Sequence, residues 1–324
     1  MKRRRVLIVL LVLVALPLIG AGWQRLATDR DHRRYPPPGE IVTVDDQGTR
    51  LHLHTQGRHH RESNPDTPVV LLDAGTPGFS AQWGWISSAI AEFSTVVAYD
   101  RPGLGWSDPR PEKDPFHPRD TADRLHTALQ KVGLPGPYLL VGHSYGALTS
   151  RVFAAAYPDQ ISGIVLVDPS HPDQGGNPAG SMWFMTALAH TGALRLGLAT
   201  GMFDSRIGNL PERQADEAAA IFVQPGQWSA VEHELSAWGD IASQLEHAEP
   251  LGDLPLTVLT AGTTSPEEHR LHQEIAALSS RGSHTSVAEA THLSMLTDRQ
   301  HSQATVDAVR AVFTACSGCS LVRR

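Results

Sequence analysis

Short apolar runs of strand length recur along the chain and are separated by polar stretches. Several are continuously apolar rather than alternating, which is typical of strands buried on both faces of a parallel sheet. The predicted strands are residues 69–73, 95–99, 138–141, 161–167, 256–260 and 285–288. Before them, residues 41–44 and 51–55 flank the turn sequence Asp45-Asp46-Gln47-Gly48, which predicts a β-hairpin.

Helical patterns lie between these strands, at residues 121–132, 147–157 and 305–314. The alternation of strands and helices predicts a doubly wound α/β sheet of mostly parallel strands. Residues 171–252 break this rhythm, because they look helical and contain no convincing strand. We expect them to form a helical lid over one edge of the sheet. The predicted core is then residues 41–170 and 253–314, followed by a tail at 315–324.

The chain begins with a long uncharged segment. Residues 6–23 carry no charge over 18 positions and follow the basic cluster Lys2-Arg3-Arg4-Arg5. A helix of that length reaches about 27 Å, enough to cross a thin bilayer, and basic residues stay on its cytoplasmic side. We expect residues 1–23 to form a signal anchor, a transmembrane helix that places the rest of the chain outside the cytoplasm. Cleavage at Gly20-Ala21-Gly22 would instead give a secreted protein, although the length of the run favours an uncleaved anchor.

Residues 24–40 and the overall charge complete this outline. The stretch is polar and ends in Pro36-Pro37-Pro38, which is typical of a stiff extended spacer, so we interpret it as a linker.

The 324 residues have a net charge of −7, but residues 1–34 hold eight basic and two acidic residues. The remainder therefore carries 19 basic and 32 acidic residues. A body this acidic argues against nucleic-acid binding, which needs a basic face.

The cysteines and a group of histidines give weaker signals. Cys316 and Cys319 form a C-x-x-C pair in the tail, which can close a disulfide outside the cytoplasm but cannot complete a four-ligand zinc site. The histidines in and after the hairpin are His52, His54, His59 and His60. Because no carboxylate cluster accompanies them, we interpret them as a solvated hairpin edge rather than a metal site.

The clearest chemical signal is the sequence Gly142-His143-Ser144-Tyr145-Gly146. It follows a predicted strand and precedes a helical pattern, which is the setting that a G-x-S-x-G motif requires. So sharp a reversal strains the backbone at the serine, and small flanking residues let strand and helix approach. Ser144 is therefore a candidate nucleophile at the carboxyl edge of the sheet. We expect His143, whose side chain points away from that of Ser144, to shape the pocket floor.

With this turn, the chain resembles the α/β-hydrolase family over about residues 41–314. Residues 100–107 are very like the family's D-x-x-G-x-G-x-S loop, and residues 290–293 look like its late histidine block. Asp73-Ala74-Gly75 lies at the first glycine-rich turn, where many members have His-Gly. The resemblance implies an α/β-hydrolase fold with a lid and a serine hydrolase that needs no cofactor or metal. It also implies the chain order serine, acid, histidine.

A serine hydroxyl needs a base within reach, and the base needs an acid that holds its tautomer. We expect His292, late in the chain and before the final helix, to be the base. Asp168 ends an apolar strand one strand after the serine strand, at a place where some members carry the acid. Members usually place it after the strand at 256–260, but Glu267 and Glu268 there follow a proline, as if starting a solvated helix. We favour Asp168 and keep the two glutamates as alternatives.

Acyl transfer also needs hydrogen-bond donors for the oxyanion. The amide of Tyr145 begins a helix, where amides are unpaired, and the amide of Thr76 lies in the first glycine-rich turn. These residues predict a serine hydrolase acting on a small-molecule carboxylic ester through an acyl-enzyme. An amidase or aminopeptidase and a perhydrolase would use the same triad. A non-catalytic binding protein on the same fold is the alternative from another class.

Overall fold

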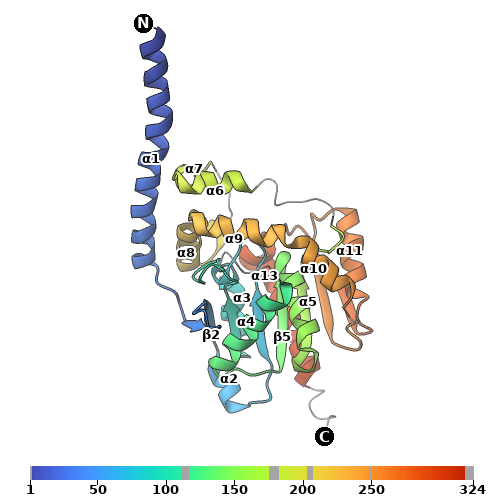
Figure 1. Ribbon diagram of the computed structural model, residues 1–324. Coiled ribbons are helices and arrows are strands. Elements are labelled where there is room, and N and C mark those ends of the chain that lie inside the picture. Colours follow the sequence, from blue (N-terminus) through green and yellow to red (C-terminus); the bar gives the residue numbers. More distant parts are fainter. Residues whose placement is uncertain (1, 111–116, 175–181, 203–206, 249, 318–324) are drawn as a thin grey trace.

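One sheet of eight strands forms the centre of the computed structural model, which describes residues 2–110, 117–174, 182–202, 207–248 and 250–317 (Figure 1). Its strand order is β1-β2-β4-β3-β5-β6-β7-β8. β2 runs antiparallel to β1 and to β4, and the other neighbours are parallel. The strands are β1 (Glu40–Thr43), β2 (Arg50–Gln56), β3 (Val69–Asp73), β4 (Val96–Tyr99), β5 (Tyr138–His143), β6 (Ile161–Val167), β7 (Leu256–Ala261) and β8 (Gly282–Val287). The predicted mostly parallel sheet is confirmed.

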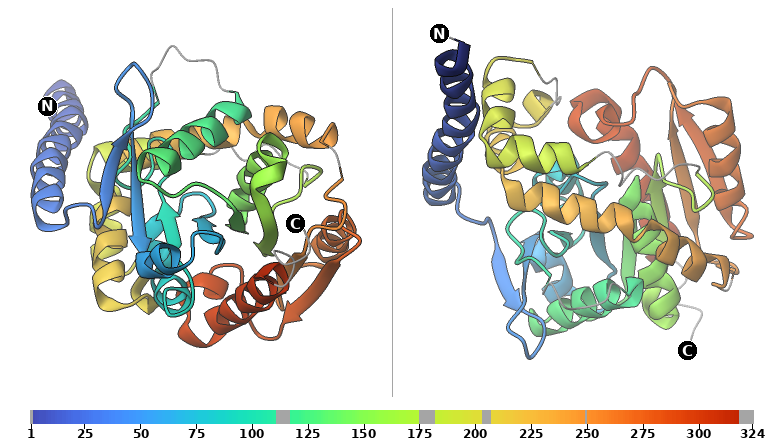
Figure 2. Two further views of the ribbon diagram at one scale, coloured as in Figure 1. Left: turned by 90° about the horizontal axis from the view of Figure 1, so that it is seen from below. Right: turned by 45° about the horizontal axis from the view of Figure 1, so that its top comes forward.

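Helices cover both faces of this sheet, so its central strands are buried on both sides (Figure 2). α4 and α5 pack on one face, and α3 and α13 on the other. Leu71 of β3 faces the first core and Leu72 the second, as the alternation of a strand requires. The helices outside the lid are α2 (Arg58–Ser63), α3 (Gly84–Ile90), α4 (Pro118–Lys131), α5 (Tyr145–Ala156), α11 (Pro266–Ala276), α12 (Ser294–Thr297) and α13 (Arg299–Ser317).

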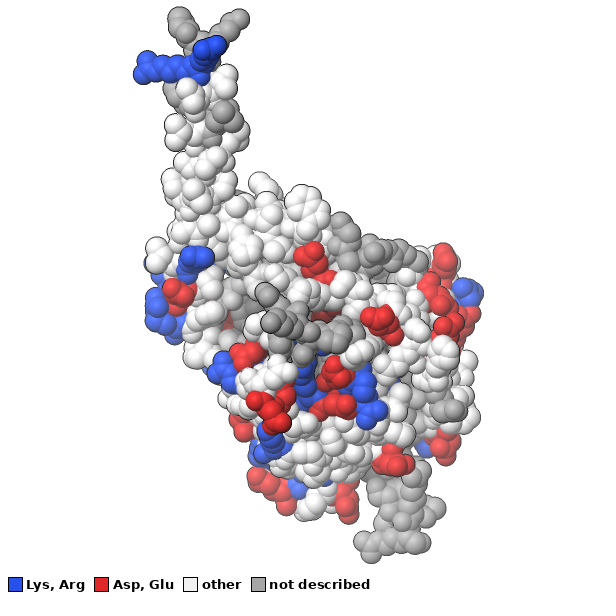
Figure 3. Space-filling view, viewed as in Figure 1, with Lys and Arg blue, Asp and Glu red and all other residues white. Residues whose placement is uncertain are grey.

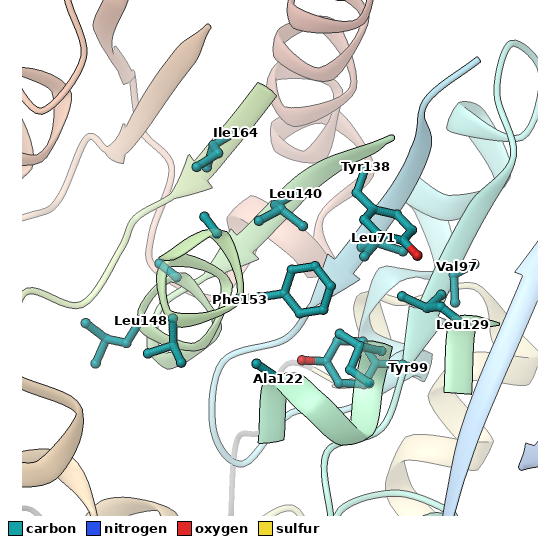
Figure 4. Packing of buried hydrophobic residues seen from close by; sticks show 14 of the residues in the cluster. Leu71, Val97, Tyr99, Ala122, Leu129, Tyr138, Leu140, Leu148, Phe153 and Ile164 are labelled. Atoms are coloured by element: carbon teal, nitrogen blue, oxygen red, sulfur yellow. The ribbon is translucent and has the colours of Figure 1, made fainter. Parts of the chain in front are cut away.

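Large apolar side chains fill the core between the sheet and the α4/α5 layer. Figure 4 shows the Phe153 ring of α5 among Leu140 and Tyr138 of β5 and Tyr99 of β4. The Phe153 and Tyr138 rings meet edge to face, with their centroids 5.7 Å apart. This packing fixes α5 against β5 and thereby the turn that joins them.

The predicted lid is present as a group of helices between β6 and β7, over the carboxyl edge of the strands (Figure 1). It has an apolar core of its own, in which Trp228 and Val231 of the lid pack with Phe79 and Leu104 from loops of the sheet. Lid and sheet therefore form a continuous body. The lid helices are α6 (Trp183–His190), α7 (Ala193–Ala199), α8 (Glu212–Phe222), α9 (Pro225–Ser236) and α10 (Trp238–Glu246).

The first helix, α1 (Lys2–Arg34), lies beside the lid, and its first half extends beyond the body with exposed basic residues near its start (Figures 1 and 3). Among the described residues, no helix combines the length and the apolar character needed to cross a membrane. The transmembrane segment predicted at 1–23 is therefore not supported. After Trp23, α1 continues into a stretch with six charged residues. The extracytoplasmic location stays a prediction.

The linker predicted at 24–40 is helical up to Arg34 and packs on the lid. Gln24 Nε2 donates to the carbonyl of Val223 over 2.8 Å, and Arg195 forms an ion pair of 2.7 Å with Asp31. The prediction of an extended spacer was wrong for residues 24–34, because the prolines act only after them. Pro36 disfavours helical backbone at Tyr35, and three prolines follow in a row, so α1 ends at Arg34. Cys319, and with it the predicted disulfide, lies outside the described residues.

A buried corner joins the hairpin to the loop after β4. Asp100 accepts hydrogen bonds from the amides of Ser80 (2.7 Å) and Trp106 (2.9 Å), and its Oδ2 lies 2.8 Å from His52 Nδ1. His52 Nε2 lies 2.6 Å from the carbonyl of Pro38. Both ring nitrogens thus face acceptors, an arrangement that suits the protonated ring. His52 is fully buried, so the prediction of a solvated histidine was wrong at this position.

This corner predicts a pH-dependent part of the stability. Burial would lower the pKa of His52, but Asp100 outweighs burial and raises that pKa above its usual 6.5. The stabilisation is fully present below pH 6.5 and is lost as the pH rises through the raised pKa. We expect the difference in unfolding free energy between the wild type and His52→Gln to shrink from pH 6 to pH 9. Urea denaturation across this pH series measures it.

His190→Gln, at an exposed histidine of α6, is the control for this prediction. Its difference from the wild type should stay constant over the same series. A constant difference for His52→Gln as well would contradict a charged His52.

Candidate active site

Ser144 occupies a sharp turn between β5 and α5, as the motif predicts. Its backbone has φ 52° and ψ −122°, a region that residues with side chains rarely adopt. The turn is held by hydrogen bonds from the Ser144 amide to the carbonyl of Val167 (3.2 Å) and from the Ser170 amide to the carbonyl of Ser144 (3.1 Å). These bonds to β6 and to the residues just after it compensate the backbone strain. The strained turn exposes Ser144 at the carboxyl edge of the sheet.

Gly146 makes this turn possible by its lack of a side chain. A Cβ at this position would overlap the carbonyl oxygens of Asp73 and Ala74, at the end of β3. The first turn of α5 therefore passes directly over the loop that follows β3. The same close approach brings Gly75 of that loop against Ser144 and His143.

Asp168 and His292 lie together at the same edge. His292 Nδ1 is 2.6 Å from Asp168 Oδ2, although the two residues are 124 positions apart in the chain. Asp168 Oδ1 accepts hydrogen bonds from the amide of Ala261 and the hydroxyl of Thr264, each over 2.9 Å. Asp168 is 6% exposed and its backbone has φ 41°, a second strained position at this edge. The imidazole is thereby oriented, and its Nε2 is left for other contacts.

The electrostatics of the pair favour an ionised aspartate. Burial would raise the pKa of Asp168, but the hydrogen bond and the charge of His292 and the donors Ala261 and Thr264 hold it well below its usual range. His143 lies behind this pair, with its Nε2 3.1 Å from the carbonyl of His292. Burial lowers the pKa of His143, as does the neighbouring His292, so this ring is neutral at ordinary pH. A fixed carboxylate therefore faces one side of His292.

Ser144, Asp168 and His292 line one cavity of about 310 Å³. The Glu268 carboxylate also reaches this cavity but is held elsewhere: it accepts from Gln174 Nε2 over 2.7 Å and from Ser265 Oγ over 2.8 Å, in the capping box of α11. Glu267 is exposed in the first turn of the same helix. Of the three candidate acids, Asp168 is the one in contact with His292.

Comparisons with known proteins agree with this fold. The family model of the alpha/beta hydrolase fold matches residues 67–196. A thermophilic esterase from Thermogutta terrifontis superposes with a TM-score of 0.64 at 20% identity, covering 85% of this chain and 100% of that one. The epoxide hydrolase CorEH superposes with a TM-score of 0.64 at 17% identity, covering 85% of this chain and 98% of that one.

The structure has the α/β-hydrolase fold, and residues 67–196 are similar to the family of that fold. A curated relative from Schizosaccharomyces pombe, uncharacterised, is 29% identical over 155 residues, which is 40% of this chain and 28% of that protein. The chain thus spans less than a third of that relative. These likenesses show the fold. The esterase and the epoxide hydrolase superpose equally well, so the choice of reaction depends on the residues of this site.

In this structure, the two predicted oxyanion residues come from neighbouring elements. Tyr145 is the first residue of α5, and Thr76 follows Gly75 in the loop that packs against Ser144. Sequence reasoning missed Thr264 and His272 around Asp168. Thr264 bonds to Asp168, and His272 Nδ1 lies 3.9 Å from Asp168 Oδ1. Neither residue belongs to a recognisable motif, and only the folded chain brings them there.

The close approach at Gly146 gives a direct prediction. In Gly146→Ala the new methyl group collides with backbone, which cannot move aside as a flexible side chain can. We expect a lower melting temperature and loss of Ser144 reactivity towards a fluorophosphonate probe. Gly226→Ala is the matched control, because a Cβ at this helical glycine of α9 meets nothing within 4 Å. Full reactivity in Gly146→Ala would show that the turn tolerates a wider separation.

Proposed function

We propose that this protein is a serine hydrolase that cleaves a small carboxylic ester through an acyl-enzyme, with Ser144, His292 and Asp168 as its triad. The observation that carries the proposal is the 2.6 Å contact of His292 Nδ1 with Asp168, at the edge where the strained turn exposes Ser144. A nucleophile on a tight turn, a base and an oriented carboxylate are the parts that acyl transfer needs.

Each group has a definite role in the proposed reaction. Ser144 Oγ attacks the ester carbonyl carbon while His292 Nε2 takes the hydroxyl proton. The amides of Thr76 and Tyr145 stabilise the oxyanion of the tetrahedral intermediate. The C–O bond to the alcohol then breaks, and the protonated His292 donates its proton to the leaving oxygen. Water, deprotonated by His292, attacks the acyl-enzyme in the same way and releases the acid.

Asp168 keeps His292 in the tautomer that this cycle requires. Its carboxylate accepts from Nδ1, so the lone pair of the neutral ring lies on Nε2, the atom that takes the Ser144 proton in this cycle. Its low pKa keeps it ionised, so it also stabilises the imidazolium that forms in each half of the reaction. Epoxide and haloalkane hydrolysis are disfavoured, since related enzymes use Asp as the nucleophile, where this chain has Ser144.

The cavity favours small substrates without negative charge. Its described lining includes Glu268 and Gln174 but neither Lys nor Arg. A carboxylate in the lining repels anionic esters, and a volume of about 310 Å³ suits a short acyl chain. We prefer an ester to an amide because an alkoxide leaves more readily than an amine anion and therefore depends less on protonation by His292.

The test of the function compares the full chain with its Ser144→Ala variant. We expect the wild type to release p-nitrophenol from p-nitrophenyl acetate faster than from the octanoate and to react with a fluorophosphonate, and the variant to do neither. Labelling without ester turnover would favour an amidase. No labelling and no turnover in either protein would favour the binding-protein alternative.

The role of Asp168 is tested by Asp168→Asn. The amide oxygen keeps the bonds from Ala261 and Thr264, so the NH2 group faces His292 Nδ1 and donates to it, which puts the ring proton on Nε2. We therefore expect kcat for the acetate ester to fall about 10³- to 10⁴-fold, with a much smaller change in KM. Steady-state kinetics of p-nitrophenol release measures both. Glu267→Gln, which changes an exposed carboxylate outside the cavity, should keep wild-type kcat.

Glu268→Gln completes this series, because Glu268 is the other candidate acid at the cavity. Wild-type activity in Asp168→Asn together with a large loss in Glu268→Gln would reverse the assignment of the acid.

A further inference from the structure

A buried arginine connects the lid to the loop beside Ser144. Arg101, in the loop after β4, is 3% exposed. Its Nη1 donates to Asp73 Oδ1 at the end of β3 over 2.5 Å. Its other side meets Glu234 of lid helix α9, with Nε 2.5 Å from Oε1 and Nη2 3.0 Å from Oε2. Since Asp73 and Glu234 are themselves buried, at 3% and 7% exposure, this is a closed ionic bridge between two layers of the protein.

The Arg101 bridge also binds the backbone of the loop after β3, which contains Thr76. Arg101 Nη1 also donates to the carbonyl of Ala74, two residues before Thr76. Asp73 Oδ2 accepts from the hydroxyl of Tyr99 over 2.7 Å and from Thr149 Oγ1 of α5. Hydrogen bonds to the Asp73 carboxylate and to the Ala74 carbonyl therefore fix the start of the loop after β3. The carboxylate of Asp73 is thus the link between the end of β3 and Arg101.

The same bridge reaches the other half of the proposed oxyanion hole. The Tyr145 hydroxyl donates to the carbonyl of Glu234 over 3.0 Å, and the Arg101 guanidinium lies 5.3 Å from the centroid of the Tyr145 ring. Tyr145 supplies one of the two amides and the loop after Ala74 supplies the other. Both amides are thus connected to lid helix α9, through Glu234 and also through Gln227, whose Nε2 donates to the carbonyl of Pro77 over 2.6 Å.

On one side, α9 packs in the apolar core of the lid through Val231 and Leu235. A cavity of about 180 Å³ lies between α9, at Gly226, Ala230 and Glu234, and the opposite wall formed by Arg101 and Pro102. Here the helix is tied to the body by the ion pair with Arg101. Burial would lower the pKa of Arg101, but Glu234 and Asp73 outweigh it and raise that pKa well above its usual range. The guanidinium therefore stays charged at every working pH.

We propose that Glu234 is a positioning residue of the oxyanion hole. Through Glu234, the position of lid helix α9 sets the geometry of the Thr76 and Tyr145 amides. The inference rests on the serine-hydrolase function proposed above. With Glu234 in place, Arg101 is drawn between two carboxylates and holds Ala74. Without that charge, the guanidinium is free to turn towards Asp73. The Ala74 carbonyl, and with it the Thr76 amide, then loses its fixed position. The effect falls on kcat, because the amides bind the oxyanion more strongly than the ground-state carbonyl.

Glu234→Gln tests this coupling, since it keeps the shape of the side chain and removes its charge. We expect kcat for p-nitrophenyl acetate to fall about 10- to 100-fold while KM changes by less than about threefold. The affinity for a boronic acid, which forms a tetrahedral adduct with the serine hydroxyl, should fall by a similar factor. Glu234→Asp, which keeps the charge on a shorter side chain, should lie between the wild type and Glu234→Gln. It also gives a readout if the glutamine variant fails to fold.

Glu217→Gln is the matched control. Glu217 is a buried glutamate of lid helix α8 that pairs with Arg213 over 2.8 Å and belongs to none of the contacts of Arg101. A merely structural salt bridge predicts that both variants lose activity in proportion to their loss of thermal stability. The coupling predicts that only Glu234→Gln loses kcat and boronate affinity at a temperature where both are folded.

The two proposals fail in different ways. A fluorophosphonate-labelled, ester-cleaving wild type with unchanged kcat and boronate affinity in folded Glu234→Gln and Glu234→Asp would overturn the coupling alone. Equal losses in Glu217→Gln would do the same. A wild type that neither labels nor cleaves esters would overturn the proposed function, and the coupling with it.

Discussion

The reversal of the chain at Ser144 is the constraint on which the rest of the site depends. It requires α5 to leave β5 with almost no space between them, which is why backbone of the β3 loop lies against Gly146. It also requires β6 to bond the strained serine amide. Because β3, β5 and β6 are parallel, their carboxyl ends meet at this reversal, and the loop at Ala74 and the carboxylate of Asp168 arrive there without further arrangement.

Much of this arrangement could be predicted from local sequence. The buried strands follow from their continuous apolar runs, and the turn at Ser144 follows from its flanking glycines. The lid was recognised from the loss of strand signals after β6. Short α3 was missed, since a helix of two turns gives little periodicity. The end of α1 was misplaced, because the polar residues of 24–34 gave no hint that the lid would supply their partners.

What local sequence could not give are the pairings of charged residues that lie far apart. Arg101 and Glu234 are separated by 133 positions, and His52 and Asp100 by 48. Each of these residues, taken alone, is typical of a solvated surface. Only the close packing of lid, loops and sheet removes their water, and the cost of burying one charge then requires the other. The polar framework of the site is therefore a product of the tertiary fold.

The contact of α1 with the lid has a practical consequence for enzymology. Asp31 neutralises Arg195 of α7, and Gln24 caps the carbonyl of Val223 at the end of α8. A chain shortened to begin at Tyr35 would leave an arginine without its counter-ion and expose the apolar surface around Gly192 that Trp23 now covers. The lid of the shortened chain would then be less stable in its position than the lid of the whole protein. Measurements of the proposed activity on such a fragment would therefore describe a protein that has lost part of its scaffold.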